Sequence, residues 1–233
     1  MVTGFDRIVI AVPDVVAAAS EYQQLLGVEP LIHRERTADP PVAWLCLANT
    51  IIELVPGAAE QARIRGVVFS EPEAGVMAEP VTNALGLDLG LCNGSATEDY
   101  RQRRGAGQAE LWQVDHLVLH TVDAVRCIQL FGEQLGLRLA LDKTVPEWGG
   151  RMLFFRAGQL TLEVIESTRS KIEADTFWGI AYQCQDIEQA SRQLAGRGGE
   201  LSAIRDGRKP GTRVATLKSH CLGIPSLLIE PAA

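Results

Sequence analysis

An internal repeat constrains this chain more than any other feature of its sequence. Residues 5–28 and residues 114–137 align without a gap at an offset of 109 positions. The alignment pairs identical residues at several places: Asp6 with Asp115, Asp14 with Asp123, Leu26 with Leu135, and Gly27 with Gly136. Self-similarity at a fixed offset indicates that one supersecondary unit is used more than once.

Each copy has the same local pattern. A short alternating apolar run predicts a strand, and an aspartate, Asp14 or Asp123, follows at the position of a helix N-cap. Apolar residues then recur at helical spacing, and Gly27 or Gly136 closes the helix at its C′ position. The pattern therefore predicts a strand followed by an amphipathic helix in both copies.

Strand-like runs separated by turn residues complete each unit. After the first helix they are Leu31–Arg36, Trp44–Leu47 and Thr50–Val55, and in the later copy Arg138–Val145, Met152–Arg156 and Leu160–Ile165. A further copy begins near Phe177, with an N-cap at Asp186 and strands at Glu200–Arg205, Thr212–Leu217 and Ser226–Glu230. The order in each unit is strand, helix, strand, strand, strand.

Residues 64–108 form a shorter and less regular unit. Arg63–Ser70 and Leu85–Cys92 predict strands, but the stretch from Glu71 to Pro80, rich in glutamate, proline and glycine, is a poor helix. We interpret it as a degenerate second module that ends in a polar linker or an exposed helix at Thr97–Gln108. The sequence thus predicts an α+β protein of four βαβββ modules, in two domains that span residues 1–108 and 113–233.

Charge and composition disfavour several classes of protein. The net charge of −7 argues against binding to nucleic acid or to an anionic membrane surface. No apolar run approaches the roughly 20 residues that span a bilayer, and the N-terminus lacks a signal-peptide pattern, so we expect a cytoplasmic protein. The five cysteines form no CxxC pair, which predicts buried, inert thiols.

The tandem βαβββ modules resemble the vicinal-oxygen-chelate superfamily of glyoxalases, bleomycin-resistance proteins and extradiol dioxygenases. The resemblance covers nearly the whole chain and is most specific in VDHLVLHTVDAV at 114–125, in LTLEVIES at 160–167 and in residues 211–231. It implies two glyoxalase-like domains with curved mixed sheets, each around a cleft. In many members a divalent metal lies in that cleft, held by His or Gln on the first strand of a module and by Glu on the last.

The third module has a residue suited to each of these two positions. His116 matches the first-strand position, and the two-residue period of a strand places it on one face with Val118 and His120. Glu163 matches the last-strand position and is the only charge in an apolar strand, so it needs a partner. The resemblance implies that zinc, iron, manganese or nickel is this partner. A hydrogen bond to a polar neighbour is the alternative.

The other modules depart from the family pattern. Arg7 stands at the first-strand position of the first module, where we expect a salt bridge to Glu53 in place of a metal. The second and fourth modules have Gly66 and Gly179 there. Glu230, on the last strand of the fourth module, is the candidate third metal ligand or catalytic base. An extradiol dioxygenase needs two histidines and a glutamate, and the missing second histidine disfavours that activity.

Other residues are candidate contacts for a substrate. The segment from Arg205 to Lys218 is locally basic, and Arg208 and Arg213 are expected to hold the carboxylate or phosphate of an anionic ligand, unless the segment is only a solvated turn. Trp148 lies in a glycine-containing loop that would close over a ligand or pack back on its own sheet. His120 shares the predicted face of His116.

The preferred prediction is a glyoxalase-like enzyme that acts on a small molecule. It would carry out metal-assisted isomerase or lyase chemistry next to a carbonyl, with His116, Glu163 and Glu230 as metal ligands and the two glutamates as catalytic groups. The alternative is a non-enzymatic protein that binds a small molecule, as bleomycin-resistance proteins do. The sequence is compatible with a monomer or a homodimer.

Overall fold

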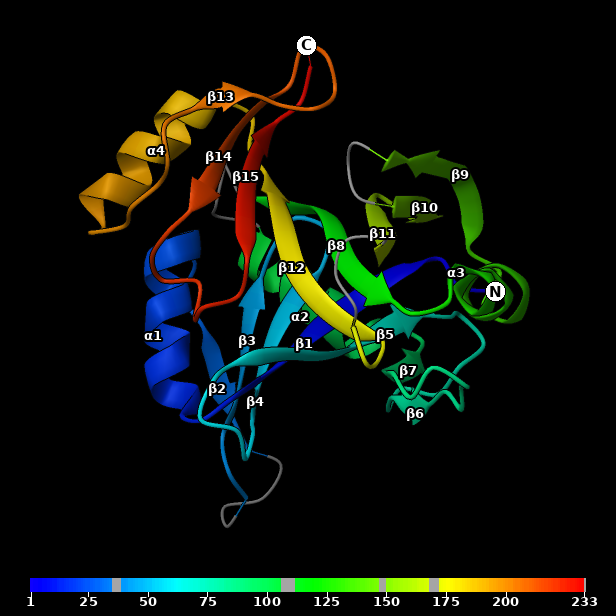
Figure 1. Ribbon diagram of the computed structural model, residues 1–233. Coiled ribbons are helices and arrows are strands. Elements are labelled where there is room, and N and C mark those ends of the chain that lie inside the picture. Colours follow the sequence, from blue (N-terminus) through cyan, green and yellow to red (C-terminus); the bar gives the residue numbers. More distant parts are fainter. Residues whose placement is uncertain (35–38, 106–111, 147–149, 168–171, 233) are drawn as a thin grey trace.

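The chain folds into two mixed β-sheets, one from each copy of the long repeat (Figure 1). The computed structural model describes residues 1–34, 39–105, 112–146, 150–167 and 172–232. Sheet A consists of β1 (Gly4–Val12), β2 (Leu31–His33), β3 (Val42–Cys46), β4 (Ile51–Pro56), β5 (Arg63–Ser70), β6 (Glu79–Pro80) and β7 (Asp88–Cys92), in the spatial order β2-β3-β4-β1-β5-β7-β6.

Sheet B repeats this arrangement with one more strand and with a longer strand, β9, at one edge. It consists of β8 (Gln113–Thr121), β9 (Arg138–Val145), β10 (Gly150–Ala157), β11 (Leu160–Ser167), β12 (Thr176–Gln183), β13 (Arg205–Asp206), β14 (Arg213–Leu217) and β15 (Ser226–Glu230), in the order β13-β14-β15-β12-β8-β11-β10-β9. The predicted α+β fold with two mixed sheets is confirmed.

Aspartate caps start three of the helices. The helical segments are α1 (Val15–Leu26), α2 (Ser95–Gly105), α3 (Ala124–Cys127), the π-helix η1 (Ile128–Gln134) that continues α3, and α4 (Ile187–Gly196). Asp14, Asp123 and Asp186 accept hydrogen bonds from backbone N–H groups in the first turns of α1, α3 and α4, as the sequence predicts. Gly27 ends α1 in the left-handed conformation with φ at 69°.

A central antiparallel pair joins two modules within each sheet. In sheet A the pair is β1 with β5, and in sheet B it is β8 with β12. The last strand of a module lies parallel to its first strand, so β11 lies beside β8 and β15 lies beside β12. Because Thr161 of β11 lies opposite His116 of β8, the fold places Glu163 close to His116 along the neighbouring strand.

The helices leave one face of sheet B uncovered by any extensive helix contact among the described residues. Helices α3 and α4 contact β11, β14 and β15, on the face that carries the buried side chains of Leu162, Ala215 and Leu228. We call the opposite face the open face of sheet B. Side chains alternate along a strand, so His116 and Glu163 belong to this open face.

Both faces of sheet A are covered by helices. Helix α1 contacts β3 and β4 on the face of Leu45 and Leu54. Helix α2 contacts β3 from the other side, where Tyr100 packs with Cys46 and Ile51 in a small separate cluster. Helix α2 therefore occupies the side of sheet A that corresponds to the open face of sheet B.

One hydrophobic core joins the two halves of the molecule. It contains residues of both sheets, including the fully buried Tyr22 of α1 and Tyr182 of β12. Arg197, after α4, donates hydrogen bonds to the carbonyl oxygens of Gln24 (2.6 Å) and Leu25 (3.1 Å), which lie at the end of α1. These contacts satisfy carbonyl groups that a helix C-terminus leaves without partners and fix one half against the other.

Several local predictions need correction. Helix α2 forms where a linker or exposed helix is predicted, but Thr97 and Tyr100 on it are buried, with 1% and 6% of their surface exposed. The predicted strand Glu200–Arg205 is reduced to Arg205–Asp206 and an isolated bridge at Leu201. Among the described residues, no helix has the length and apolar character that a membrane span requires.

Candidate functional site

A β-bulge precedes the first-strand ligand position in each half. In β1, Phe5 lies opposite Phe69 and Arg7 opposite Val68, so Asp6 is the extra residue. In β8, Val114 lies opposite Tyr182 and His116 opposite Ala181, so Asp115 is the extra residue. A bulge re-aims the side chains next to it and is common beside functional sites. It lets the aspartate approach the side chain of the residue that follows it.

Three side chains form a continuous cluster on the open face of sheet B. The Nδ1 atom of His116 lies 2.8 Å from Oδ2 of Asp115, and its Nε2 atom lies 3.3 Å from Oε2 of Glu163. The side chains of Asp115, His116 and Glu163 are 38%, 20% and 12% exposed, so water reaches this cluster most freely at Asp115. The structure thus brings His116 and Glu163 together, and it adds Asp115, which the sequence analysis does not single out.

Cations border this cluster. The hydrogen bond from His116 lowers the pKa of Asp115 against the effect of its burial, and the charges of His116, Arg156 and Lys209 lower it further. Arg156 lies on β10 opposite Thr161, which itself lies opposite His116. The ionised form of Asp115 is therefore favoured, and basic side chains stand near enough to influence a bound anion.

The corresponding cluster in sheet A is closed. The Nε atom of Arg7 donates to Oε2 of Glu53 at 3.1 Å, which confirms the predicted salt bridge. The second carboxylate oxygen of Glu53 accepts a hydrogen bond from Nε1 of Trp44 at 2.8 Å. Asp6 pairs with Arg7 and accepts from the hydroxyl of Thr97 on α2. Burial alone would lower the pKa of Arg7, but the charges of Glu53 and Asp6 raise it.

Glycines occupy the equivalent positions in the second and fourth modules. Gly179 lies opposite Val118 while His116 lies opposite Ala181, so the two-fold symmetry of the β8–β12 pair exchanges His116 with Gly179. A Cβ atom on Gly179 would lie 2.6 Å from the carbonyl oxygen of Pro225, and one on Gly66 would lie 2.0 Å from that of Asp88. The neighbouring backbone therefore leaves no room for a second first-strand ligand.

Glu230 is not part of this cluster. Its carboxylate accepts hydrogen bonds from Nε and Nη2 of Arg213 at 2.9 and 2.8 Å and from the backbone N–H of Ile187 at 2.8 Å. Leu228, two residues earlier, is fully buried in the core, so Glu230 lies on the helix face of β15. This corrects the expectation that it shares a face with His116 and Glu163.

Glu166 explains the role of Glu230. Its carboxylate accepts a hydrogen bond from the backbone N–H of Ala124 at 3.0 Å, at the start of α3, just as Glu230 does at the start of α4. Negative charge is favoured at a helix N-terminus. The two glutamates are equivalent helix-capping residues in the third and fourth modules.

The remaining predicted contacts are spread over the half formed by sheet B. Arg213 pairs with Glu230 and, at 3.3 Å, with Glu188 of α4, so the structure directs it toward the helix face. Arg208 is exposed on the turn between β13 and β14. His120 stacks on Trp178, a residue that the sequence analysis does not select. Trp148 lies outside the described residues.

Metal-binding groups are sparse in the part of the chain that the structure describes. Within it, no group of three or more His, Cys, Asp or Glu side chains is placed to hold a metal ion. The five cysteines are free and buried, as predicted, and burial raises the pKa of Cys127 and of Cys184 to about 12. The thiols of Cys127 and Cys184 are therefore neutral and unsuited to metal binding or nucleophilic attack.

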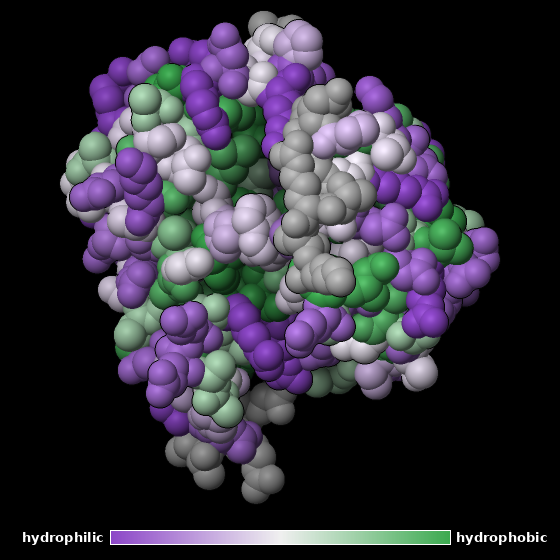
Figure 2. Space-filling model, in the orientation of Figure 1, coloured by the Kyte–Doolittle hydropathy of each residue, from purple (hydrophilic) through white to green (hydrophobic). Residues whose placement is uncertain are grey.

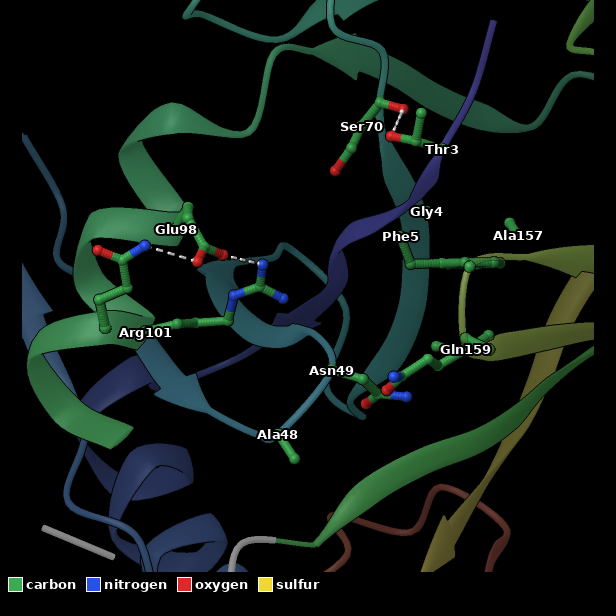
Figure 3. A pocket seen from close by; sticks show the side chains of 13 residues that line it. Thr3, Gly4, Phe5, Ala48, Asn49, Ser70, Glu98, Arg101, Ala157 and Gln159 are labelled. Carbon is green, nitrogen blue, oxygen red and sulfur yellow. Dashed lines mark hydrogen bonds and ion pairs between the residues drawn. The ribbon is translucent and has the colours of Figure 1, made fainter. Parts of the chain in front are cut away.

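A cavity of about 460 Å³ lies elsewhere, at the seam between the two halves. Helix α2, the start of β1 and the turn between β10 and β11 line it (Figure 3). Its charged groups are already engaged, because Glu98 pairs with Arg101 and accepts from Gln102. We therefore give more weight to the open face, where the titratable groups of His116 and Glu163 remain accessible. Figure 2 shows apolar residues exposed between hydrophilic ones on the side where β12, β14 and β15 lie.

Comparisons with known proteins agree with this architecture. Residues 115–216 match the family model of the Glyoxalase/Bleomycin resistance protein/Dioxygenase superfamily. A mutant of 4-hydroxymandelate synthase from Streptomyces coelicolor aligns with all of this chain and 94% of its own, with a TM-score of 0.75 and 14% identity. At that identity the likeness concerns the fold.

Shorter proteins align with about half of the chain. A hypothetical protein from Bacillus halodurans C-125 has a TM-score of 0.45 and 17% identity over 52% of this chain and 96% of its own. Methylmalonyl-CoA epimerase from Mycobacterium tuberculosis has a TM-score of 0.44 and 18% identity over 52% of this chain and 88% of its own. No curated protein matches the sequence.

Proposed function

We propose that this chain, in which residues 115–216 match the family model of the Glyoxalase/Bleomycin resistance protein/Dioxygenase superfamily, is an enzyme that acts on a small molecule at the open face of sheet B. The reaction would be proton transfer at a carbon next to a carbonyl, of the isomerase or lyase type. The observation that carries the proposal is the position of His116, whose two ring nitrogens each face a carboxylate, of Asp115 and of Glu163.

The arrangement of His116 suits a group that takes up a proton. A neutral imidazole has one N–H, and we place it on Nδ1, whose contact with Asp115, at 2.8 Å, is the shorter of the two. Nε2 then turns its lone pair toward Glu163, 3.3 Å away, which is a contact between two acceptors. Placing a proton between them removes the repulsion, so the pair is well placed to accept one from a ligand.

Nearby cations would hold the charge that this transfer creates. Removing a proton beside a carbonyl leaves negative charge on the carbonyl oxygen, and preorganised cations stabilise such charge. Arg156 and Lys209, which act on Asp115 through their charge, are the candidates. Arg213, which the sequence suggested for holding an anionic ligand, is no longer a candidate for this role, because it is bound to Glu230.

A metal ion fits the pair only in part. Two donors bound to the same tetrahedral ion at about 2.0–2.1 Å lie about 3.3 Å apart, which is the separation of His116 Nε2 and Glu163 Oε2. Catalytic zinc sites usually have three protein ligands, and the described residues offer no third. If zinc, iron, manganese or nickel binds, His116 and Glu163 would hold it and it would polarise the carbonyl. The proton transfer proposed here does not depend on it.

A second candidate is a protein that only binds its ligand. The absence of room for a side chain at Gly66 and Gly179 favours it, because it removes the ligands that metal-dependent members place there. The same absence weighs against an extradiol dioxygenase, which needs a second histidine. The two candidates share the open face and differ in whether a bond to hydrogen is broken.

Deuterium exchange separates the candidates. Small 2-oxo acids and acyl thioesters would be incubated with the protein in D2O, and loss of the hydrogen next to the carbonyl followed by NMR. We expect exchange with the wild type and a loss of at least about 100-fold in His116→Ala and Glu163→Gln. Glu133→Gln, an exposed position on η1, makes the same change of charge and should retain the activity.

The outcomes decide the function. Exchange that survives both substitutions would place the chemistry elsewhere in the molecule. Binding of these compounds without exchange would leave the binding protein as the function. A parallel titration with zinc, manganese, iron(II) or nickel salts, read as a rise in melting temperature, tests the metal: a rise lost in His116→Ala assigns it to this pair.

A further inference from the structure

We propose that Trp178 and His120 form an aromatic platform that holds a flat aromatic ring of the ligand beside the His116–Glu163 pair. The inference rests on the proposed function, since it names the class of ligand for the same open face. It starts from the side chain of Trp178, which is 48% exposed although it is one of the largest apolar groups of the chain.

A β-bulge sets the direction of Trp178. In the β8–β12 pair, Leu119 lies opposite Phe177 and Val118 opposite Gly179, so Trp178 is the extra residue. Phe177 is buried in the core, and the bulge turns the next side chain away from it. Trp178 is the symmetry counterpart of Asp115, the bulge residue of β8 that orients His116.

The ring of Trp178 lies flat on His120. The ring centroids are 4.9 Å apart and the planes are inclined by 16°. Burial lowers the pKa of His120, so the imidazole is neutral around pH 7 and the stack carries no charge. An uncharged, flat surface of this kind suits another flat aromatic ring, because aromatic groups prefer stacked or edge-on contact with one another.

The platform lies on the same face as the reactive pair. His120 follows His116 by four residues on β8, so the period of the strand puts both on the open face. At a rise of about 3.3 Å per residue their Cα atoms are about 13 Å apart. The backbone of Trp178 falls within this interval, opposite Val118 and Leu119. A ligand with a ring at one end and a carbonyl at the other matches this layout.

Among its described residues, the other half of the molecule has no such aromatic pair at the equivalent positions. The bulge residue of β5 is Arg65, because Val9 lies opposite Gly66 and Ile10 opposite Ile64. Arg65 pairs with Asp88 at 2.6 Å, and both side chains are about half exposed. The offset of 109 positions puts Ala11 where His120 stands. The aromatic pair is therefore specific to the sheet that carries His116 and Glu163.

Two probes of equal size test the platform. Benzoylformate and cyclohexylglyoxylate carry the same 2-oxo acid group, and only the first has a flat aromatic ring. Calorimetry with the wild type should give an affinity for benzoylformate higher by about fivefold to tenfold. Trp178→Ala should bind both with the weaker affinity, and Trp178→Phe should keep most of the preference.

The controls separate stacking from general hydrophobicity and from the proposed chemistry. Leu141→Ala removes an aliphatic side chain of the same exposed fraction, 48%, on β9, and should keep the preference. A wild type without preference for the aromatic ring, or without binding to either probe at millimolar concentration, would overturn the platform. So would a preference unchanged in Trp178→Ala. Ring preference in a protein that exchanges no deuterium would refute the proton transfer and leave the platform standing.

Discussion

The two sheets carry the same cluster in two different settings. In each, a bulged aspartate precedes the first-strand position and a glutamate stands on the parallel strand, as Asp6 and Glu53 in sheet A and Asp115 and Glu163 in sheet B. Sheet A places Arg7 between its carboxylates and covers them with α2. Sheet B places His116 there and leaves the face open.

The difference between arginine and histidine explains why one cluster is closed and the other is accessible. Arginine stays charged and donates several hydrogen bonds at once, so it neutralises two carboxylates permanently. Histidine donates one hydrogen bond when neutral and two when protonated. The same backbone therefore yields a structural ion-pair network in sheet A and a site that responds to a proton or a ligand in sheet B.

The largest expected effect comes from removing the central cation of sheet A. Arg7→Met leaves the carboxylates of Asp6 and Glu53 without their partner, and the side chain of Asp6 is only 1% exposed, against 38% for its counterpart Asp115. We expect a loss of about 3–5 kcal/mol in the free energy of unfolding, the usual effect of breaking a buried pair. Urea denaturation followed by circular dichroism measures it.

Matched substitutions show whether the loss is specific. His116→Ala at the equivalent position should lose no more than about 1 kcal/mol, because water reaches its partner Asp115, whose side chain is 38% exposed. Arg65→Met, which removes an arginine from an exposed pair with Asp88, should behave like His116→Ala. Equal losses of unfolding free energy in Arg7→Met and His116→Ala would contradict the view that the cluster in sheet A is buried and the cluster in sheet B is accessible.

A smaller effect is expected from the helix that covers sheet A. Tyr100 of α2 is 6% exposed, packs on Cys46 and Ile51, and donates a hydrogen bond to the carbonyl oxygen of Trp44 at 3.1 Å. Tyr100→Ala should destabilise the protein by about 3 kcal/mol, and Tyr100→Phe, which loses only the hydroxyl, by about 1 kcal/mol. Thermal and urea unfolding measure both, and a Tyr100→Ala protein of unchanged stability would show that α2 contributes little to covering the face.

The sequence predicts the scaffold well because its signals are local. Asp14, Asp123 and Asp186 are caps that act on the residues immediately after them, and Gly27 is needed for a left-handed turn. The burial of α2 is not predictable in this way. Its first turns are polar apart from Ala96 and Tyr100. Tyr100 and Thr97 find partners that lie more than 50 residues away in sequence.

The candidate site is predicted in part, and the errors have physical causes. The family pattern correctly places His116 near Glu163, but Asp115 and Trp178 face the site because of bulges, which depend on the partner strand. The expectation for Glu230 failed through register. That expectation requires the last strand of the fourth module to be shifted by one residue from the register that the equivalent contacts of Glu230 and Glu166 give. A slip of one residue transfers a side chain to the other face of a sheet.

A third prediction concerns Gly179, which the two-fold symmetry of the β8–β12 pair relates to His116. Gly179→Ala would put a Cβ atom 2.6 Å from the carbonyl oxygen of Pro225, and relieving that overlap should destabilise the protein by about 1–3 kcal/mol. Gly196→Ala is the control, since a Cβ atom there meets nothing within 4 Å and replaces a helical glycine. It should stabilise the protein by up to about 1 kcal/mol. If Gly179→Ala were neutral in urea denaturation, a side chain could be placed there after all.

The smallest effect is expected at Glu230, and it tests whether this residue belongs to the helix face. Its hydrogen bonds with Arg213, followed by that with the N–H of Ile187, lower its pKa below the ordinary value of 4.5. A carboxyl group whose pKa is lower in the folded state stabilises the protein above its unfolded pKa, and this contribution disappears as the pH falls through the folded pKa. Glutamine keeps an acceptor for the N–H of Ile187 and removes the charge facing Arg213. Glu230→Gln should therefore lower the melting temperature by no more than about 2 °C at pH 7, the range of an exposed pair. The difference from the wild type should shrink as the pH is lowered below 4.5.

Deuterium exchange and any stabilisation by zinc should be the same in the Glu230→Gln variant as in the wild type, because the carboxylate of Glu230 points away from His116. A loss of exchange as large as that expected in Glu163→Gln would return Glu230 to the reactive cluster and overturn the register that separates the two faces of β15.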